Sequence, residues 1–308
     1  MLCAYVSGYT MLELRAKAEL GTLLQYLKQY LHRSAIVAGH VNIIMQEVLP
    51  SGCESRVFVD SWPQPRMKAL LEVAAKSAGV GVQCEYGNIL RSFVSDVTHS
   101  LKNLFRTKSH IFLLDEYRNV SVVRDVYGKY GKIGRKSDYP ELLRMNVMSE
   151  ERQAKLAKLK IELPSELYFG SVNPEEAGFV NDMWGGKFEG SEAIFKERLT
   201  YLPSYAFRQK SDDKLVAFTC TDHLGFGVNG WVAEDWRGRG VLGKLMILAI
   251  QTELAVSMKR AYGTPPLYFG FVHPSNTKSI KGMQKIGIEV LDSIRVELLQ
   301  FSPFQAKL

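Results

Sequence analysis

One glycine-rich segment has residue types and a spacing suited to binding phosphate. Residues 231–244 read WVAEDWRGRGVLGK, so an apolar strand runs into a loop with three glycines and then into an amphipathic helix. Glycines let a backbone approach a ligand closely, and the first N–H groups of a helix lack partners and lie at its positive end. Arg239 and Lys244 add positive charge. The segment therefore predicts a pyrophosphate site formed by Arg237, Gly238, Arg239, Gly240, Val241, Leu242 and Gly243.

Two common phosphate-binding motifs differ from this segment. Its spacing is neither the G-x-x-x-x-G-K-[ST] of nucleoside triphosphatases nor the G-x-G-x-x-G of dinucleotide-binding folds. The spacing Arg237-x-x-Gly240 instead resembles the [QR]-x-x-G-x-[GA] signature of the GNAT acyltransferases. Leu242 departs from it, because the family prefers glycine or alanine at that position. The alternative interpretation is a tight glycine turn that only begins an ordinary helix.

A second segment fits the same superfamily. Residues 269–276 read FGFVHPSN and lead into a helical pattern that Gly287 closes. They resemble the later GNAT motif, a strand followed by a helix that opens with asparagine. The resemblance implies that the Asn276 side chain binds the pantetheine arm of coenzyme A or orients two splayed strands. The alternative is that Asn276 only caps its helix, as asparagine often does.

Four more segments occur in an order that resembles the glycine N-acyltransferase family of animals. They are VFVDSWP at 57–63, VNDMW at 180–184, FKER at 195–198 and LPSYA at 202–206. The resemblance implies an α/β (α+β) GNAT fold with two GNAT-like halves and a mixed, splayed central sheet in the C-terminal one. It also implies acyl-CoA as co-substrate, no permanently bound cofactor, glycine or a similar small amino acid as acceptor, and a mitochondrial location, with the cytoplasm as the alternative.

The general base of that family does not carry over. Its glutamate falls at Phe226, and phenylalanine cannot take a proton from an amine. His223, just upstream, has a suitable intrinsic pKa and is the predicted catalytic residue. Asp222 and His273 are further candidates, although all three residues fit an ordinary surface or buried role. A water-relayed base and a loss of activity are also consistent with phenylalanine at position 226.

Backbone groups at the end of the strand before the loop complete the predicted site. N–H groups near Trp231, Val232 and Ala233 are expected to hold the thioester carbonyl and stabilise the oxyanion. Three functions follow from the motifs. The first is acyl transfer to a small amine by direct attack, the second is a non-catalytic acyl-CoA-binding module, and the third is an acetyltransferase for protein or polyamine amines.

The elements expected around these segments mix helices and strands. In the second half we expect helices at 173–184, 191–199, 241–260 and 277–286, and strands at 214–221, 227–232, 267–273 and 294–301. In the first half we expect helices at 11–33, 65–77 and 149–160, strands at 57–59, 80–82 and 111–114, and an exposed basic loop at 129–136. The strands at 227–232 and 267–273 are expected to diverge around the thioester.

Composition indicates a globular protein of two domains. The chain has 308 residues, 46% of them hydrophobic, and we expect an N-terminal glycine N-acyltransferase-like domain at 1–155 and a C-terminal acyl-CoA-binding catalytic domain at 156–308. The net charge of +7 permits an anionic partner. The sequence has no block of basic residues interleaved with aromatics, so nucleic acid binding is not predicted. Four scattered cysteines predict reduced thiols in an intracellular compartment and no metal site. The sequence contains no apolar run long enough to predict a transmembrane helix.

Overall fold

The computed structural model describes residues 3–6, 9–29, 31–47, 55–59, 69–74, 79–84, 110–115, 131–135, 142–145, 147–185, 187, 190–222, 225, 227–257 and 267–303. The chain forms two compact units. Unit one comprises Met1–Val41, Ser51–Arg144 and Leu291–Leu308, and unit two comprises Asn42–Pro50 and Met145–Val290. The last strand of the chain thus belongs to the same unit as the N-terminal residues. No helix in the described ranges is long and apolar enough to cross a membrane.

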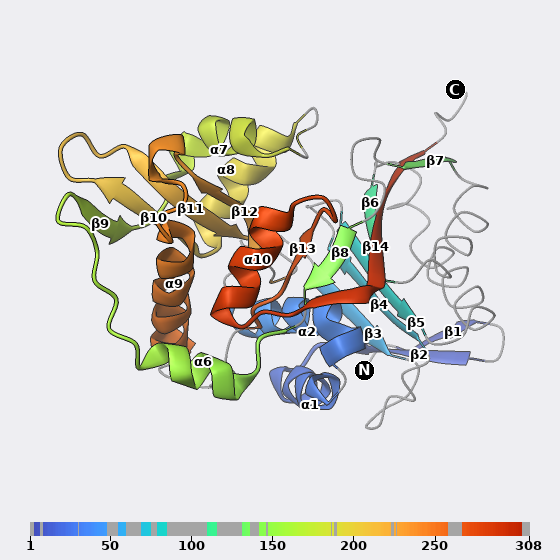
Figure 1. The fold of residues 1–308 in the computed structure, drawn as a ribbon. Helices are drawn as coiled ribbons and strands as arrows, with labels where there is room; N and C mark the ends of the chain where they lie inside the picture. The colour runs from blue at the N-terminus through green and yellow to red at the C-terminus, as the bar shows by residue number, and fades with distance from the viewer. Residues whose placement is uncertain are drawn as a thin grey trace. The chain divides into compact units, whose positions relative to one another are not determined.

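Unit one is built on a sheet with the order β1-β2-β3-β4-β5-β6-β14-β8, and β7 pairs with β14 (Figure 1). Each pair of neighbouring strands from β1 to β5 is antiparallel, whereas the pair β5 and β6 is parallel. Their bounds are β1 Cys3–Val6, β2 Tyr9–Leu14, β3 Ser55–Val59, β4 Ala69–Ala74, β5 Gly79–Cys84, β6 His110–Asp115, β7 Gly131–Arg135, β8 Leu142–Met145 and β14 Val290–Pro303. Helix α1 (Lys17–Lys28) buries one leucine face, and α2 (Leu31–Met45) follows it.

Three expectations for the first half are wrong. Residues 11–14 belong to β2 rather than to the predicted helix, residues 69–74 form β4 inside the predicted helix 65–77, and residues 131–135 form β7 inside the predicted loop. Strand β2 pairs with β3, β4 with β3 and β5, and β7 with β14, and cross-strand pairing overrides a local helical or loop pattern. The predicted strands at 57–59, 80–82 and 111–114 are confirmed.

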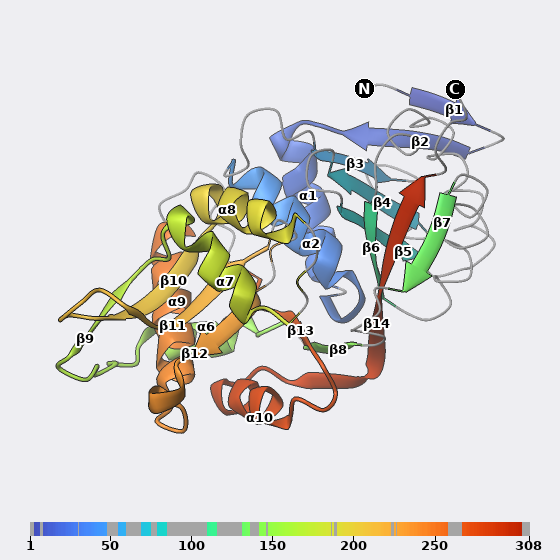
Figure 2. The same ribbon diagram turned by 90° about the horizontal axis from the view of Figure 1, so that it is seen from above.

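Unit two is built on a four-stranded antiparallel sheet with the order β12-β11-β10-β9. Helices α7 and α8 cover one face of this sheet and α9 covers the other (Figures 1 and 2). Strand β13 lies outside the four-stranded sheet, so the described chain leaves β12 as a free edge. The bounds are β9 Leu167–Gly170, β10 Ser204–Gln209, β11 Leu215–Thr221, β12 Gly227–Val232, β13 Gly270–Val272, α6 Glu150–Ala157, α7 Ala177–Met183, α8 Ser191–Tyr201, α9 Val241–Ser257 and α10 Thr277–Ile286.

Local sequence explains where these helices begin and end. Ser149 caps α6, since its Oγ accepts a bond of 3.2 Å from the Arg152 N–H. Asn276 caps α10 in the same way, through a bond of 3.1 Å from the Ser279 N–H. Gly287 ends α10 with a φ of 90°, a conformation that glycine adopts at little cost. The predicted helices of the second half are confirmed within a few residues, and α10 has the predicted bounds.

Each face of the four-stranded sheet carries its own apolar core. The α7–α8 face buries Val180, Phe195, Leu199, Ala206, Phe218 and Cys220. The α9 face buries Leu167, Phe207, Val216, Ala217, Val241 and Leu245. Strand side chains alternate between the two faces, which accounts for the two cores. Strands β9 and β10 were not predicted, and the segment LPSYA, expected as a turn, enters β10 at Ser204.

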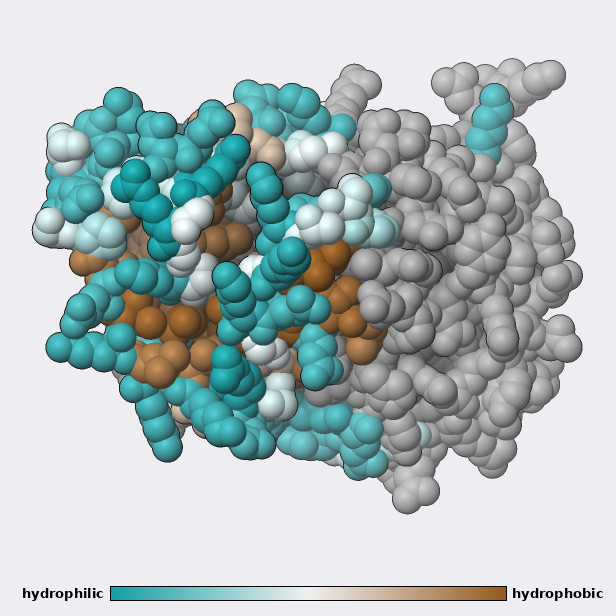
Figure 3. Space-filling model, viewed as in Figure 1, coloured by the Kyte–Doolittle hydropathy of each residue, from teal (hydrophilic) through white to brown (hydrophobic). Residues whose placement is uncertain are grey.

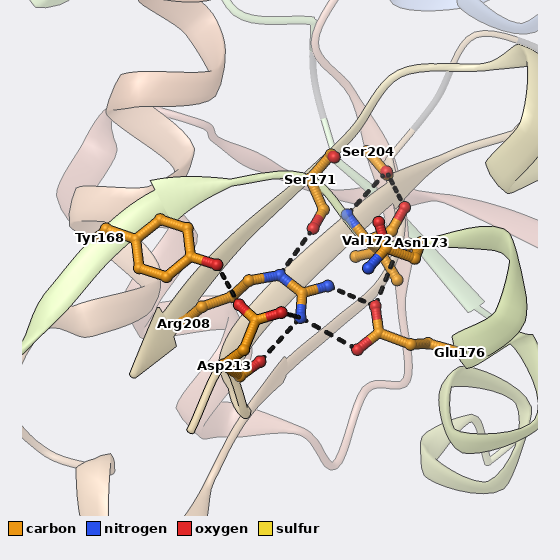
Figure 4. Close-up of polar contacts among 8 residues, drawn as sticks. All are labelled: Tyr168, Ser171, Val172, Asn173, Glu176, Ser204, Arg208 and Asp213. Atoms are coloured by element: carbon orange, nitrogen blue, oxygen red, sulfur yellow. Dashed lines mark hydrogen bonds and ion pairs between the residues drawn. The ribbon is translucent and has the colours of Figure 1, made fainter. Parts of the chain in front are cut away.

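A buried arginine ties this sheet to the turn before α7 (Figure 4). The Arg208 guanidinium, 4% exposed, donates two hydrogen bonds to the Glu176 carboxylate. Its Nε donates to the Ser171 carbonyl at 3.0 Å, and its Nη1 donates to the Asp213 carbonyl at 2.8 Å. Glu176 also accepts the Asn173 N–H at 2.8 Å. All of these contacts lie within unit two, and they fix the path of the chain from β9 into α7.

Candidate acyl-CoA site

The loop between β12 and α9 presents a row of backbone N–H groups. A short 3₁₀ turn at Glu234–Trp236 follows β12, and the Lys244 N–H makes the first bond of α9, at 3.1 Å to the Gly240 carbonyl. No described residue accepts a hydrogen bond from the N–H groups of residues 238–243. These donors lie at the positive end of a helix of 17 residues. The segment is therefore arranged to accept an anion with several oxygen atoms.

Glycines shape this loop at two kinds of position. Gly238 and Gly240 have φ values of 76° and 72°, and a Cβ added at either would meet no described atom within 4 Å. The space above the loop is thus open. A Cβ added at Gly243 would lie 3.7 Å from Ile286 of α10, an ordinary van der Waals distance, so this position lies where α9 packs against α10.

Three basic side chains surround the loop in different ways. Arg237 is held at the end of β12, since its Nε donates to the Val232 carbonyl at 3.1 Å. The Arg239 guanidinium lies over the Trp236 ring, 5.2 Å from its centroid. Lys244 donates from Nζ to the Glu162 carbonyl at 2.9 Å. Arg237 and Arg239 are exposed beside the loop, and the Lys244 ammonium adds positive charge while bonded to a carbonyl.

The last residues of β12 offer one free amide. The Ala233 N–H donates to the Val216 carbonyl at 2.8 Å, and Trp231 pairs with Phe218. In an antiparallel pair every second residue bonds to the partner strand, so the N–H of Val232 points away from β11, toward the free edge. Of the three predicted oxyanion donors, Val232 has the orientation that the role requires. Ala233 does not, because its N–H is already bonded.

Two residues of the later motif have local partners. Asn276 caps α10, in agreement with the purely structural interpretation of this residue. The His273 Nδ1 accepts the Ser275 N–H at 3.2 Å and lies 2.7 Å from the Ser275 Oγ. Because a backbone N–H donates to Nδ1, the neutral ring carries its proton on Nε2. His273 is therefore oriented as a hydrogen-bond donor at the turn after β13.

Asp222 and His223, two of the three candidate bases, lie between β11 and β12 in the sequence. His223 and Phe226 lie outside the described residues. Asp222 is buried and forms an ion pair of 2.5 Å with Arg198 of α8. This ion pair anchors the end of β11 to α8. The FKER segment contains Arg198, and this pair gives the segment a structural role that sequence reasoning missed.

Two further groups of side chains were not predicted from the sequence. On the α7–α8 face, Phe179 and Trp231 are in edge-to-face contact, with ring centroids 5.2 Å apart, and Trp231 stacks on Phe218 at 5.5 Å. On the other face, the Tyr205 hydroxyl donates to the buried Glu253 carboxylate. Burial, and then the Glu253 charge, raise the pKa of Tyr268 well above its ordinary value. Both groups join residues far apart in sequence.

Burial makes the single described free thiol inert. It raises the pKa of Cys220 from 9.0 to about 12. The unfolded chain thus loses this proton above about pH 9 while the folded chain keeps it, so this group makes stability fall as the pH rises from 9 to 12. We expect iodoacetamide at pH 8.5 to label the Cys220 peptide slowly in the native protein and rapidly in urea, as measured by mass spectrometry. Equal rates in both conditions would contradict this burial.

Comparison with known proteins shows the fold. No protein-family model matches the sequence, and no curated protein matches it. The X-ray structure of a Drosophila protein is 14% identical, with a TM-score of 0.69 over 96% of this chain and 98% of that chain. A tandem GNAT protein from the clavulanic acid biosynthesis pathway is 12% identical, with a TM-score of 0.49 over 94% and 97% of the two chains. A GCN5-related N-acetyltransferase from Sphaerobacter thermophilus is also 12% identical, with a TM-score of 0.43 over 94% and 95%.

The predicted fold class is confirmed by the order of elements. Four antiparallel strands, β9 to β12, are followed by the loop, α9, β13 and α10, and β13 does not continue the four-stranded sheet. This is the strand–loop–helix order that the GNAT resemblance implied. The Drosophila structure shares the fold over nearly the whole of both chains. Within the described ranges, no group of three His, Cys, Asp or Glu side chains could hold a metal ion.

Proposed function

We propose that the protein is an acyl-CoA-dependent N-acyltransferase that uses coenzyme A thioester as co-substrate. The observation that carries the proposal is the row of unbonded N–H groups at residues 238–243, directly after a strand whose free edge presents the Val232 N–H. One group of donors suits the pyrophosphate of coenzyme A. The other suits a carbonyl oxygen, on the same short stretch of chain. The Asn276 Oδ1 already caps α10, so in this proposal Asn276 contacts the pantetheine arm through its other polar groups.

Apolar surface beside the loop also supports the proposal. Figure 3 shows apolar residues gathered over α9, and Leu242 and Met246, one turn apart on this helix, are partly exposed. The pantetheine arm and acyl chain of an acyl-CoA are long and weakly polar. A strip of this kind next to a phosphate site matches such a ligand better than it matches a free nucleotide.

The proposed reaction is direct transfer without an acyl-enzyme. The amine nitrogen attacks the thioester carbon and forms the new C–N bond, and the negative charge that develops on the carbonyl oxygen is stabilised by the Val232 N–H. The C–S bond then breaks. The coenzyme A sulfur leaves with the electron pair and receives the proton that the amine loses. Cys220 is buried and protonated, so it is not a nucleophile.

His223 is the proposed general base, and its removal tests that role. A positioned base contributes about 10²–10⁴-fold to a rate. We expect His223→Ala to lower kcat at least about tenfold and to leave CoA affinity unchanged in calorimetry. His273→Ala tests the second candidate histidine in the same assay. Phe226→Glu, which restores the glutamate of the resembled family, should raise the rate with small amines by less than a native base would. If neither His223→Ala nor Phe226→Glu changes turnover, neither position 223 nor position 226 hosts the base.

The acceptor implied by the resemblance is glycine or a similar small amino acid, and an assay of thiol release tests it. The purified full-length protein would be supplied with acetyl-, butyryl- and benzoyl-CoA and a panel of amines. Turnover with any amine supports the enzyme. Tight CoA binding without turnover would favour the non-catalytic acyl-CoA-binding module, and turnover confined to peptides or spermidine would favour the protein or polyamine acetyltransferase. The mitochondrial location remains a prediction, and imaging of the tagged protein would test it.

A further inference from the structure

An aromatic group stands directly beside the proposed reacting carbonyl. Trp231 precedes Val232, so its side chain projects from the opposite face of β12, about 3.3 Å along the strand. Val232 packs with the α9 core, and Trp231 packs with the α7–α8 core. The donor's phosphates belong to the α9 side, at the loop. The α7–α8 side of β12, where Trp231 lies, is therefore the side left for the amine to approach the carbonyl.

The wall on that side is apolar and partly uncovered. Phe179 of α7 meets Trp231 edge to face, yet it is 40% exposed, and Met183, one turn later on α7, is also 40% exposed. Among the described strands β12 is the edge of its sheet, and Trp231 is next to Val232 on β12, so the Phe179–Trp231 pair lies beside the Val232 N–H. Aromatic and methionine side chains are enriched at recognition surfaces.

The cation buried on this face does not favour an amino acid acceptor. A free carboxylate would need a cation to hold it. Arg198, the buried arginine of the α7–α8 face, is already paired with Asp222 at 2.5 Å. Lys187 is paired with Asp182 at 3.4 Å. The uncovered rings therefore favour an apolar amine.

We propose that the acceptor of this enzyme is a primary amine carrying an aromatic or large apolar group, and that Phe179, Met183 and Trp231 bind that group. The inference rests on the proposed acyltransferase function and narrows its acceptor. Phe179 is a specificity-determining residue in this proposal. Its ring stacks against the aromatic group of the amine, while the nitrogen reaches the carbonyl beside Val232.

The test compares matched amines on the full-length protein. With acetyl-CoA as donor, kcat/KM for 2-phenylethylamine should exceed that for ethylamine and for glycine by about tenfold or more, since buried apolar groups discriminate by such factors. Phe179→Ala should lower the ratio of phenylethylamine to ethylamine about tenfold, chiefly through KM, and Phe179→Leu should lower it less. Leu159→Ala, which truncates an exposed apolar residue between α6 and β9, is the control and should leave the ratio unchanged.

The outcomes separate the two proposals. Equal kcat/KM for all three amines, or an unchanged ratio in Phe179→Ala, would overturn the inference and leave the acyltransferase in place. Turnover of glycine above phenylethylamine would do the same and restore the amino acid acceptor. An absence of turnover with every amine would overturn the proposed function and the inference with it. Thermal melts of each variant, alone and with CoA, show that it is folded and binds the donor.

Discussion

Replacing Gly240 with valine should raise the Kd for CoA about a hundredfold or more. The residue has a φ of 72°, which a β-branched side chain adopts only at a cost of about 1–3 kcal/mol. Its Cβ would also project into the open space above the loop, where a phosphate would lie. Two lost charge-assisted hydrogen bonds, each worth about 1.5–3 kcal/mol, account for the change in Kd. Calorimetric titration of CoA measures it.

Gly190→Val controls for the strain. Gly190 also has a positive φ, 84°, and open space around its Cβ, but it precedes α8 on the other face of the sheet. Both variants should lose stability by similar amounts in urea, and only Gly240→Val should lose CoA binding. Parental CoA affinity in a folded Gly240→Val protein would show that the loop does not hold the pyrophosphate.

Arg208→Met should lower the free energy of unfolding by about 3–5 kcal/mol, because breaking a buried ion pair leaves its partner charge uncompensated. Arg208 is almost fully buried and serves Glu176 and the carbonyls of Ser171 and Asp213 at once (Figure 4). Methionine keeps much of the volume and none of the donors. The loss should therefore come from the unsatisfied acceptors rather than from a cavity. Equilibrium unfolding in urea, with an unchanged m-value, measures it.

Lys214→Met is the matched control for this prediction. Lys214 and Asp212 form an ion pair of 2.7 Å on the same hairpin, but the lysine side chain is 75% exposed. Exposed ion pairs contribute little to stability, so the midpoint of unfolding should barely move. Equal losses in both variants would mean that the Arg208 contacts contribute no more than a surface pair, and the structural role assigned to them would be incorrect.

The second half of the fold was predictable because its signals are local. Helix α10 has an asparagine cap, an apolar face and a closing glycine, and these features lie within twelve residues of one another. The strand, loop and start of α9 are equally local. In the first half, β2, β4 and β7 take their structure from partners elsewhere in unit one. Residues such as Leu12 and Leu14 fit a helical pattern as well as a strand, and the pairing of β2 with β1 and β3 decides between them.

The candidate site likewise has a part set by local sequence and a part set by contacts between distant residues. The phosphate loop could be predicted, because glycine positions and the start of a helix define it within a few residues. The choice of Val232 over Ala233 as the free amide depends on the register with β11, which the sequence does not encode locally. The contact of Phe179 with Trp231 joins residues more than fifty positions apart, and spacing alone could not reveal it. Asp222 is a further example, since its ion pair with Arg198 anchors the end of β11 to α8.

The position of β14 affects how the protein is made on the ribosome. Strand β14 lies between β6 and β8 in the sheet of unit one, yet its residues follow all of unit two in the sequence. A nascent chain emerges in sequence order, and domains usually fold in that order. Here the residues of unit two emerge completely while β6 still lacks its neighbour. Unit one therefore passes through synthesis with an unpaired strand edge, the kind of surface that chaperones shield and that other chains can bind.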